Sequence, residues 1–145
     1  MPAHAATVVK LDLWDKGSTS MEKLNSEPIR GLTSAAQLGV MMGITATPST
    51  FRAGQVAFEA TNRSTDIVHE VILAPVPNAH KEMPYHADEM KVDEDKAIHL
   101  GEVSELAVGK TGELLIALKP GKYVLYCNVP GHYALGMWTE INVIP

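Results

Sequence analysis

The chain has 145 residues, 46% hydrophobic and 20% charged, a composition ordinary for one soluble domain with a real hydrophobic core. Its formal net charge is -5 and it has no basic patch, which excludes nucleic acid as an expected partner. No apolar run approaches the roughly 20 residues that span a bilayer, and the single cysteine, Cys127, excludes an internal disulfide.

Short alternating or apolar segments, typical of β-strands, recur along the whole chain. In chain order they cover residues 7–15, 44–52 with an interruption at Pro48, 55–62, 66–76, 100–103, 113–119, 122–127 and 138–144. Eleven glycines and nine prolines supply the turns between them. This pattern favours an all-β sandwich or barrel over a helical bundle.

Two segments do not fit the strand pattern. Residues 16–43 are polar at first and then run into "LTSAAQLGVMM", which predicts a short helix or a loosely packed segment. Residues 75–99 form a long connection with three prolines and the charged run "DEMKVDEDK". A connection of this length predicts a functional loop or a short helix of its own. We expect one domain over residues 1–145, with a first strand and extension in 1–43 and the core in 44–145.

The stretch "YVLYCNVPGHYALGMW" carries the chemistry, because it holds Cys127, His132 and Met137 at short spacing. A thiolate, an imidazole and a weak thioether are three of the four donors of a copper electron-transfer site, which needs one more histidine. His69 is the best candidate, because it sits in the apolar run "DIVHEVIL", where an unpaired imidazole is costly. The other histidines lie in the N-terminal tail or in polar segments.

With these residues the chain resembles the cupredoxins, the family of plastocyanin, azurin, rusticyanin and auracyanin. The matching pieces are "TNRSTDIVHEVIL", "LKPGKYVLYCNVPGHYALGMW" and "TEINV", and the resemblance covers residues 44–145. It implies a Greek-key β-sandwich with one type 1 copper, whose ligands would be His69, Cys127, His132 and Met137. It also implies an electron carrier for a redox partner such as a cytochrome or a copper enzyme.

The resemblance implies a periplasmic or otherwise extracytoplasmic protein. The first ten residues, "MPAHAATVVK", lack the basic and apolar regions of a signal peptide. The expectation is therefore a chain whose leader has been removed.

Two positions depart from the family pattern. Many cupredoxins have Asn after the first histidine ligand and Ser or Thr after the cysteine, whereas this chain has Glu70 and Asn128. We expect a reversed clasp, in which Asn128 donates to the Glu70 carboxylate; the alternative is that Glu70 points to solvent. Asn62 is expected to brace the loop before His69, or only to serve its own turn.

The loop histidine of the family reaches the surface through an apolar patch where partners dock. In this chain the patch would consist of Pro130, Tyr133, Ala134 and Leu135. The alternative is that these residues only close the end of the sandwich.

The residues argue against a copper enzyme, a cysteine nucleophile and a zinc site. Copper oxidases and nitrite reductases with cupredoxin domains have His directly before the cysteine, but this chain has Tyr126, so we expect no enzyme. A cysteine nucleophile paired with His132 would leave Met137 without a role, and zinc prefers stronger donors than a thioether.

Copper resistance, storage or delivery is the main alternative to the electron carrier. The segment "HKEMPYHADEM" would then form a second, softer copper site from His80, Met83, His86 and Met90. Methionine is also a common core residue, however.

Overall fold

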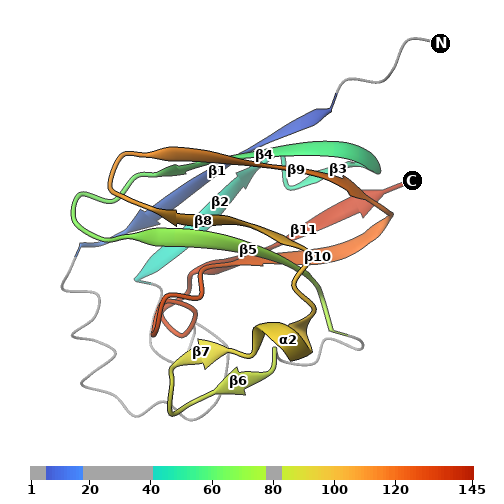
Figure 1. The fold of residues 1–145 in the computed structure, drawn as a ribbon. Helices are drawn as coiled ribbons and strands as arrows, with labels where there is room; N and C mark the ends of the chain where they lie inside the picture. Colours follow the sequence, from blue (N-terminus) through green and yellow to red (C-terminus); the bar gives the residue numbers. More distant parts are fainter. Residues whose placement is uncertain (1–5, 18–40, 78–82) are drawn as a thin grey trace.

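Two β-sheets pack face to face in the computed structural model, which describes residues 6–17, 41–77 and 83–145 (Figure 1). The four-stranded sheet has the order β2-β1-β4-β9, and the five-stranded sheet has the order β3-β11-β10-β5-β8. Their strands are β1 (Thr7–Asp15), β2 (Met42–Thr47), β3 (Thr50–Arg52), β4 (Gly54–Asn62), β5 (His69–Pro75), β8 (Gly101–Leu106), β9 (Thr111–Leu118), β10 (Gly121–Tyr126) and β11 (Trp138–Ile144). The predicted all-β sandwich is confirmed.

The space between the sheets is filled by the alternating residues that the sequence pattern places on one face. β1 and β4 are parallel neighbours, and their register puts Val9 opposite Phe58 and Leu11 opposite Ala60. All four side chains are at most 1% exposed. They pack with inward residues of the other sheet, such as Leu125. The period-2 burial therefore follows directly from the strand geometry.

The central strands β5 and β10 are buried on both faces. Leu73 and Leu125 point into the space between the sheets, whereas Ile72 and Tyr126 belong to a second apolar cluster on the outer side. That outer cluster also contains Val92. Double burial explains why these two strands read as nearly continuous apolar runs rather than as alternating ones.

The long connection supplies the cover for this outer face. It forms a hairpin of β6 (Tyr85–His86) and β7 (Lys91–Val92), followed by the helix α2 (Glu94–Ala97), beneath the five-stranded sheet in Figure 1. Asp93 caps the helix, because its Oδ1 accepts the backbone N–H groups of Asp95 and Lys96 at 3.1 Å each. The short helix predicted for the connection 75–99 is confirmed. No helix within the described ranges has the length and apolar character needed to cross a membrane.

Two strand predictions needed adjustment. The interruption expected at Pro48 is a change of sheet, since β2 ends at Thr47 in the four-stranded sheet and β3 pairs with β11 in the other. The strand expected from residue 66 begins only at His69. The Ser64 hydroxyl accepts the N–H groups of Asp66 and Ile67 at 3.2 and 2.8 Å, so these groups belong to a turn instead of the sheet. The short helix or loosely packed segment expected in residues 32–42 lies outside the described residues except for Met41 and Met42, and Met42 begins β2. Most of the N-terminal extension lies outside the described residues as well.

We expect Phe58→Ala to lower the free energy of unfolding by about 3–5 kcal/mol. Phe58 is fully buried and makes an edge-to-face contact with Phe51, at 6.3 Å between ring centroids. Its removal leaves a cavity that the two stiff sheets close only in part. Urea denaturation measures the effect, with Leu115→Ala as the control, because Leu115 is 64% exposed on β9. Equal losses in the two variants would contradict this account of the core.

Candidate metal centre

Three strand ends bring the predicted ligands to one end of the sandwich. His69 opens β5, Cys127 directly follows β10, and Met137 directly precedes β11. β5 and β10 are antiparallel neighbours, with Tyr126 opposite Ile72. The residue after Tyr126 therefore lies beside the start of β5, although 57 positions of sequence separate Cys127 from Glu70.

The loop between Cys127 and Met137 is closed by its own backbone. Cys127 N–H donates to the carbonyl of Met137 at 3.0 Å, and Met137 N–H donates to the carbonyl of His132 at 3.1 Å. His132 N–H donates in turn to the carbonyl of Val129 at 2.9 Å. Gly131 has a φ of 86°, a conformation that glycine adopts without strain. This short, bonded loop holds His132 next to the cysteine.

The donor atoms of three side chains converge. His69 Nδ1 lies 3.2 Å from His132 Nδ1, and Cys127 Sγ lies 3.4 Å from His132 Nδ1 and 4.0 Å from His69 Nδ1. The point equidistant from the three atoms is about 2.1 Å from each, within the usual range of metal–nitrogen and metal–sulfur bonds. Among the described residues, His69, Cys127 and His132 form the cluster whose donor atoms lie close enough together to hold a metal ion. The donor set therefore fits a soft transition metal.

Burial keeps all three groups neutral without a metal. It lowers the pKa of His132 to about 4, with the nearby His69 adding to the effect. It raises the pKa of the Cys127 thiol to about 12, although the backbone N–H groups of Glu70 and Val129 partly oppose that shift. The imidazole lone pairs are thus free for a metal at neutral pH, whereas the thiol must lose its proton when a metal binds.

We expect the thiol of the metal-free protein to resist alkylation by iodoacetamide at neutral pH. Cys127 is fully buried, and a pKa raised to about 12 leaves almost no thiolate at pH 7–9. Labelling followed by mass spectrometry checks this, with the urea-unfolded protein as the reactive control. Rapid labelling of the folded protein near pH 7 would instead support the nucleophile alternative.

The expected contact in which Asn128 donates to the Glu70 carboxylate is present. The Glu70 carboxylate accepts the backbone N–H of Asn128 at 3.2 Å, not its side-chain amide. The Asn128 side chain instead accepts the N–H of Val92 at 2.8 Å and donates to the Val92 carbonyl at 3.0 Å and to Glu94 at 2.8 Å. Asn128 thus donates to Glu70 as expected, through its backbone, while its side-chain amide holds β7 and α2 over the ligand loop.

Asn62 lies at the end of β4 and makes three hydrogen bonds from a buried position. Its amide donates to the carbonyls of Ile67 and Leu106 at 2.9 Å each, and its side-chain oxygen accepts the N–H of Ser64 at 2.9 Å. These bonds join the turn before His69 to the end of β8. The contacts match the bracing expected of Asn62.

The predicted docking residues differ in exposure. Pro130 is exposed, but Tyr133, Ala134 and Leu135 are at most 4% exposed. Tyr133 stacks on Trp138 at 6.1 Å between centroids, which places its ring in the outer cluster. The burial of these three side chains speaks against their direct contact with a partner. Docking at this end stays a prediction, with Pro130 as the exposed member.

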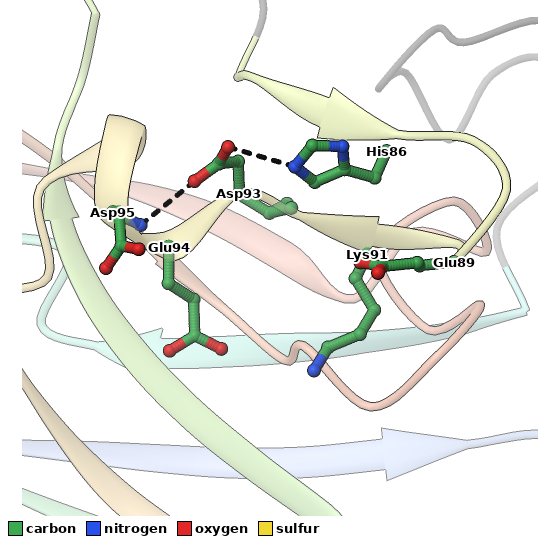
Figure 2. A pocket seen from close by; sticks show the side chains of 7 residues that line it. His86, Glu89, Lys91, Asp93, Glu94 and Asp95 are labelled. Atoms are coloured by element: carbon green, nitrogen blue, oxygen red, sulfur yellow. Dashed lines mark hydrogen bonds and ion pairs between the residues drawn. The ribbon is translucent and has the colours of Figure 1, made fainter.

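The residues of the predicted second copper site are spread over different surroundings. Met83 is packed in the outer cluster and Met90 against the core between the sheets, while His80 lies outside the described residues. His86 faces an acidic hollow, where its Nε2 lies 2.9 Å from Asp93 (Figure 2). Neither Met83 nor Met90 lines this hollow. The described part of the chain therefore does not gather the sulfur donors around His86, and the second site stays a prediction.

Sequence reasoning missed Asp15, the last residue of β1. Its Oδ2 lies 2.6 Å from His69 Nε2, and both side chains are at most 1% exposed. An acidic residue at the end of an alternating strand carries no signal of such a role. Only the pairing of distant segments brings the two residues together.

The two face-to-face sheets form the cupredoxin β-sandwich, with His69 and Cys127 at the ends of paired central strands and His132 in the loop after Cys127. No family model and no curated protein sequence matches the chain. Solved structures do. The chain is similar to an auracyanin from the photosynthetic bacterium Roseiflexus castenholzii, with a TM-score of 0.57, 17% identity and coverage of 99% of this chain and 100% of that one.

Two further solved structures show the same likeness. Auracyanin A, described as a "blue" copper protein from Chloroflexus aurantiacus, matches with a TM-score of 0.59 and 18% identity, over 97% of this chain and 100% of its own. Rusticyanin from Thiobacillus ferrooxidans matches with a TM-score of 0.59 and 17% identity, over 98% of this chain and 79% of its own. At these identities the likeness establishes the fold, and the function has to be argued from the site.

Proposed function

We propose that this protein is a single-domain type 1 copper protein that carries one electron at a time between redox partners. The observation that carries the proposal is the convergence of His69 Nδ1, Cys127 Sγ and His132 Nδ1 in a buried group with edges of 3.2–4.0 Å. Met137 is fully buried at the end of the same loop and would be the weak fourth ligand. Two histidines, a cysteine and a weak thioether are the donor set of copper electron-transfer sites.

Copper bound here would supply one-electron chemistry by cycling between Cu(I) and Cu(II). The residues of the chain hold the donors in one arrangement, because His69 and Cys127 sit at the ends of paired central strands. Glu70 N–H donates to Cys127 Sγ at 3.3 Å, which favours the thiolate form. A site whose donors are already positioned needs little rearrangement when the metal changes its charge, and this suits rapid electron exchange.

An electron carrier suits the residues better than an enzyme does. Tyr126 precedes Cys127, where the copper enzymes with this fold have a histidine that leads to a catalytic copper. The partner would be another redox protein, and an extracytoplasmic location would suit a copper protein of this kind. Docking near Pro130 would bring such a partner close to His132, two residues along the loop.

A copper(II) titration of the metal-free protein tests the proposal. We expect an intense visible absorption band, which arises from charge transfer between thiolate and copper, to saturate at one equivalent. Ascorbate should bleach the band and ferricyanide should restore it, since a carrier must cycle reversibly. The absence of any band would refute the type 1 site.

The same titration separates the carrier from the copper-handling alternative. A carrier binds one copper, so copper counting after desalting should give one ion per chain. A second tightly held ion would favour resistance, storage or delivery. The variant His86→Ala should leave the count unchanged if the chain is a carrier.

A further inference from the structure

Asp15 is a buried carboxylate that directly contacts a proposed metal ligand. Its side chain is 1% exposed, and its Oδ2 lies 2.6 Å from Nε2 of His69, whose side chain is fully buried. A carboxylate is costly to remove from water unless it is paired and hydrogen-bonded. Its placement behind His69 therefore calls for partners that compensate the burial.

Those partners surround both carboxylate oxygens with donors. Oδ1 accepts the backbone N–H of Gly17 at 2.7 Å, and the Ser64 side chain also bonds to the carboxylate. An ionised carboxylate can only accept hydrogen bonds, so the atom that faces it on the His69 ring must carry a proton.

The same logic assigns the tautomer of His69. A neutral imidazole has one N–H and one lone pair, and the hydrogen bond of one nitrogen decides the role of the other. With the proton on Nε2 toward Asp15, the lone pair is on Nδ1. That atom is the one that faces His132 Nδ1 at 3.2 Å and Cys127 Sγ at 4.0 Å.

We propose that Asp15 is a positioning residue that holds His69 in the Nε2–H tautomer and aims its Nδ1 lone pair at the metal centre. The tautomer part stands on the geometry alone, and the effect on copper rests on the function proposed above. Carboxylates behind a ligating histidine orient the ring and raise its basicity, and their loss typically costs about 10–100-fold in metal affinity. The added negative charge also favours the more positive, oxidised metal ion.

The substitution Asp15→Asn removes this function with almost no change in shape. An amide offers one acceptor and one donor, whereas Gly17 N–H and His69 Nε2–H both need an acceptor. The Asn side chain therefore accepts a hydrogen bond from one of these two N–H groups and turns its own NH₂ group toward the other. We expect a mixture of His69 tautomers and a Cu(II) affinity reduced about 10–100-fold, with a smaller reduction for Cu(I).

Asp12→Asn is the matched control. Asp12 lies on the same strand and loses the same charge, but its side chain is 46% exposed and pairs with Arg63 at 2.9 Å. Two measurements are made on the wild type and both variants. Long-range ¹H–¹⁵N NMR of the metal-free proteins reports the tautomer of His69, and competition with chelators of known affinity gives Cu(II) and Cu(I) binding.

The outcomes separate this inference from the function. A wild-type His69 protonated on Nδ1 would overturn the inference, as would equal losses of Cu(II) affinity in Asp15→Asn and Asp12→Asn. If the wild type forms no type 1 site, the proposed function fails while the NMR comparison still decides the role of Asp15. If Asp15→Asn does not fold, the tautomer of His69 in the wild type decides whether the inference holds. The variant Asp15→Glu should then keep the Nε2–H form, because its carboxylate retains two acceptor oxygens.

Discussion

Replacing Cys127 by Ser is expected to abolish the intense visible band and to weaken Cu(II) binding by more than about 100-fold, since even the loss of an outer-sphere partner costs about 10–100-fold. The band requires a thiolate, and a serine hydroxyl does not ionise near neutral pH. Cys127 Sγ is also the softest of the three converging donors, 3.4 Å from His132 Nδ1. The substitution changes one atom, so the fully buried site should keep its shape.

Met137→Leu is the matched comparison for this experiment. Met137 is also a buried sulfur-containing residue of the same loop, but its thioether would be only a weak ligand. We expect this variant to retain the band and one copper, with a changed reduction potential. Visible absorption and copper counting on both variants check the pair of expectations. A band that survives in Cys127→Ser, or one that disappears only in Met137→Leu, would contradict the assignment of Cys127 as the thiolate ligand.

Asn128→Ala is expected to lower the free energy of unfolding of the metal-free protein by about 2–4 kcal/mol. The buried side chain makes bonds of 2.8 and 3.0 Å to the backbone of Val92 and a bond of 2.8 Å to Glu94. Its removal leaves the N–H and carbonyl of buried Val92 without these partners, which costs more than the net value of the bonds. Because Asn128 follows Cys127, the ligand loop should loosen too, and copper should dissociate faster.

Urea denaturation and the rate of copper transfer to a chelator measure the two effects of Asn128→Ala. Asn142→Ala is a suitable control, because it is the same chemical change at an exposed position of β11. That variant should change the free energy of unfolding by less than about 0.5 kcal/mol. If Asn128→Ala were as stable as Asn142→Ala, the connection over the outer face would not be held through this amide.

Local patterns predicted most of the fold and the donor set. The alternation of Val9, Leu11 and Leu13 gave β1 one buried face, as expected of a period-2 strand. The spacing of Cys127, His132 and Met137 is a property of one short loop, so it could be read without knowing what the loop packs against. His69 was found because a polar ring in an apolar run needs a reason to be there.

Long-range pairings were beyond these patterns. Asp15 reaches His69 across 54 residues, and Asn128 reaches Glu94 across 34. Such contacts depend on strand order and register, and a shift of one residue would turn each side chain to the opposite face. For the same reason no local pattern indicated that the Asn128 side chain bonds to Val92 and Glu94.

Strand periodicity and loop spacing, which are local properties of the chain, thus predicted an all-β sandwich or barrel with a soft-metal donor set, and the resemblance to the cupredoxins implied the sandwich. What surrounds those donors follows from how distant segments pack. The tertiary structure buried Tyr133, Ala134 and Leu135, and it placed the Asp15 carboxylate behind His69. Burial and hydrogen-bond partners depend on which distant segments meet, and this is settled only when the two sheets and the connection over them pack together.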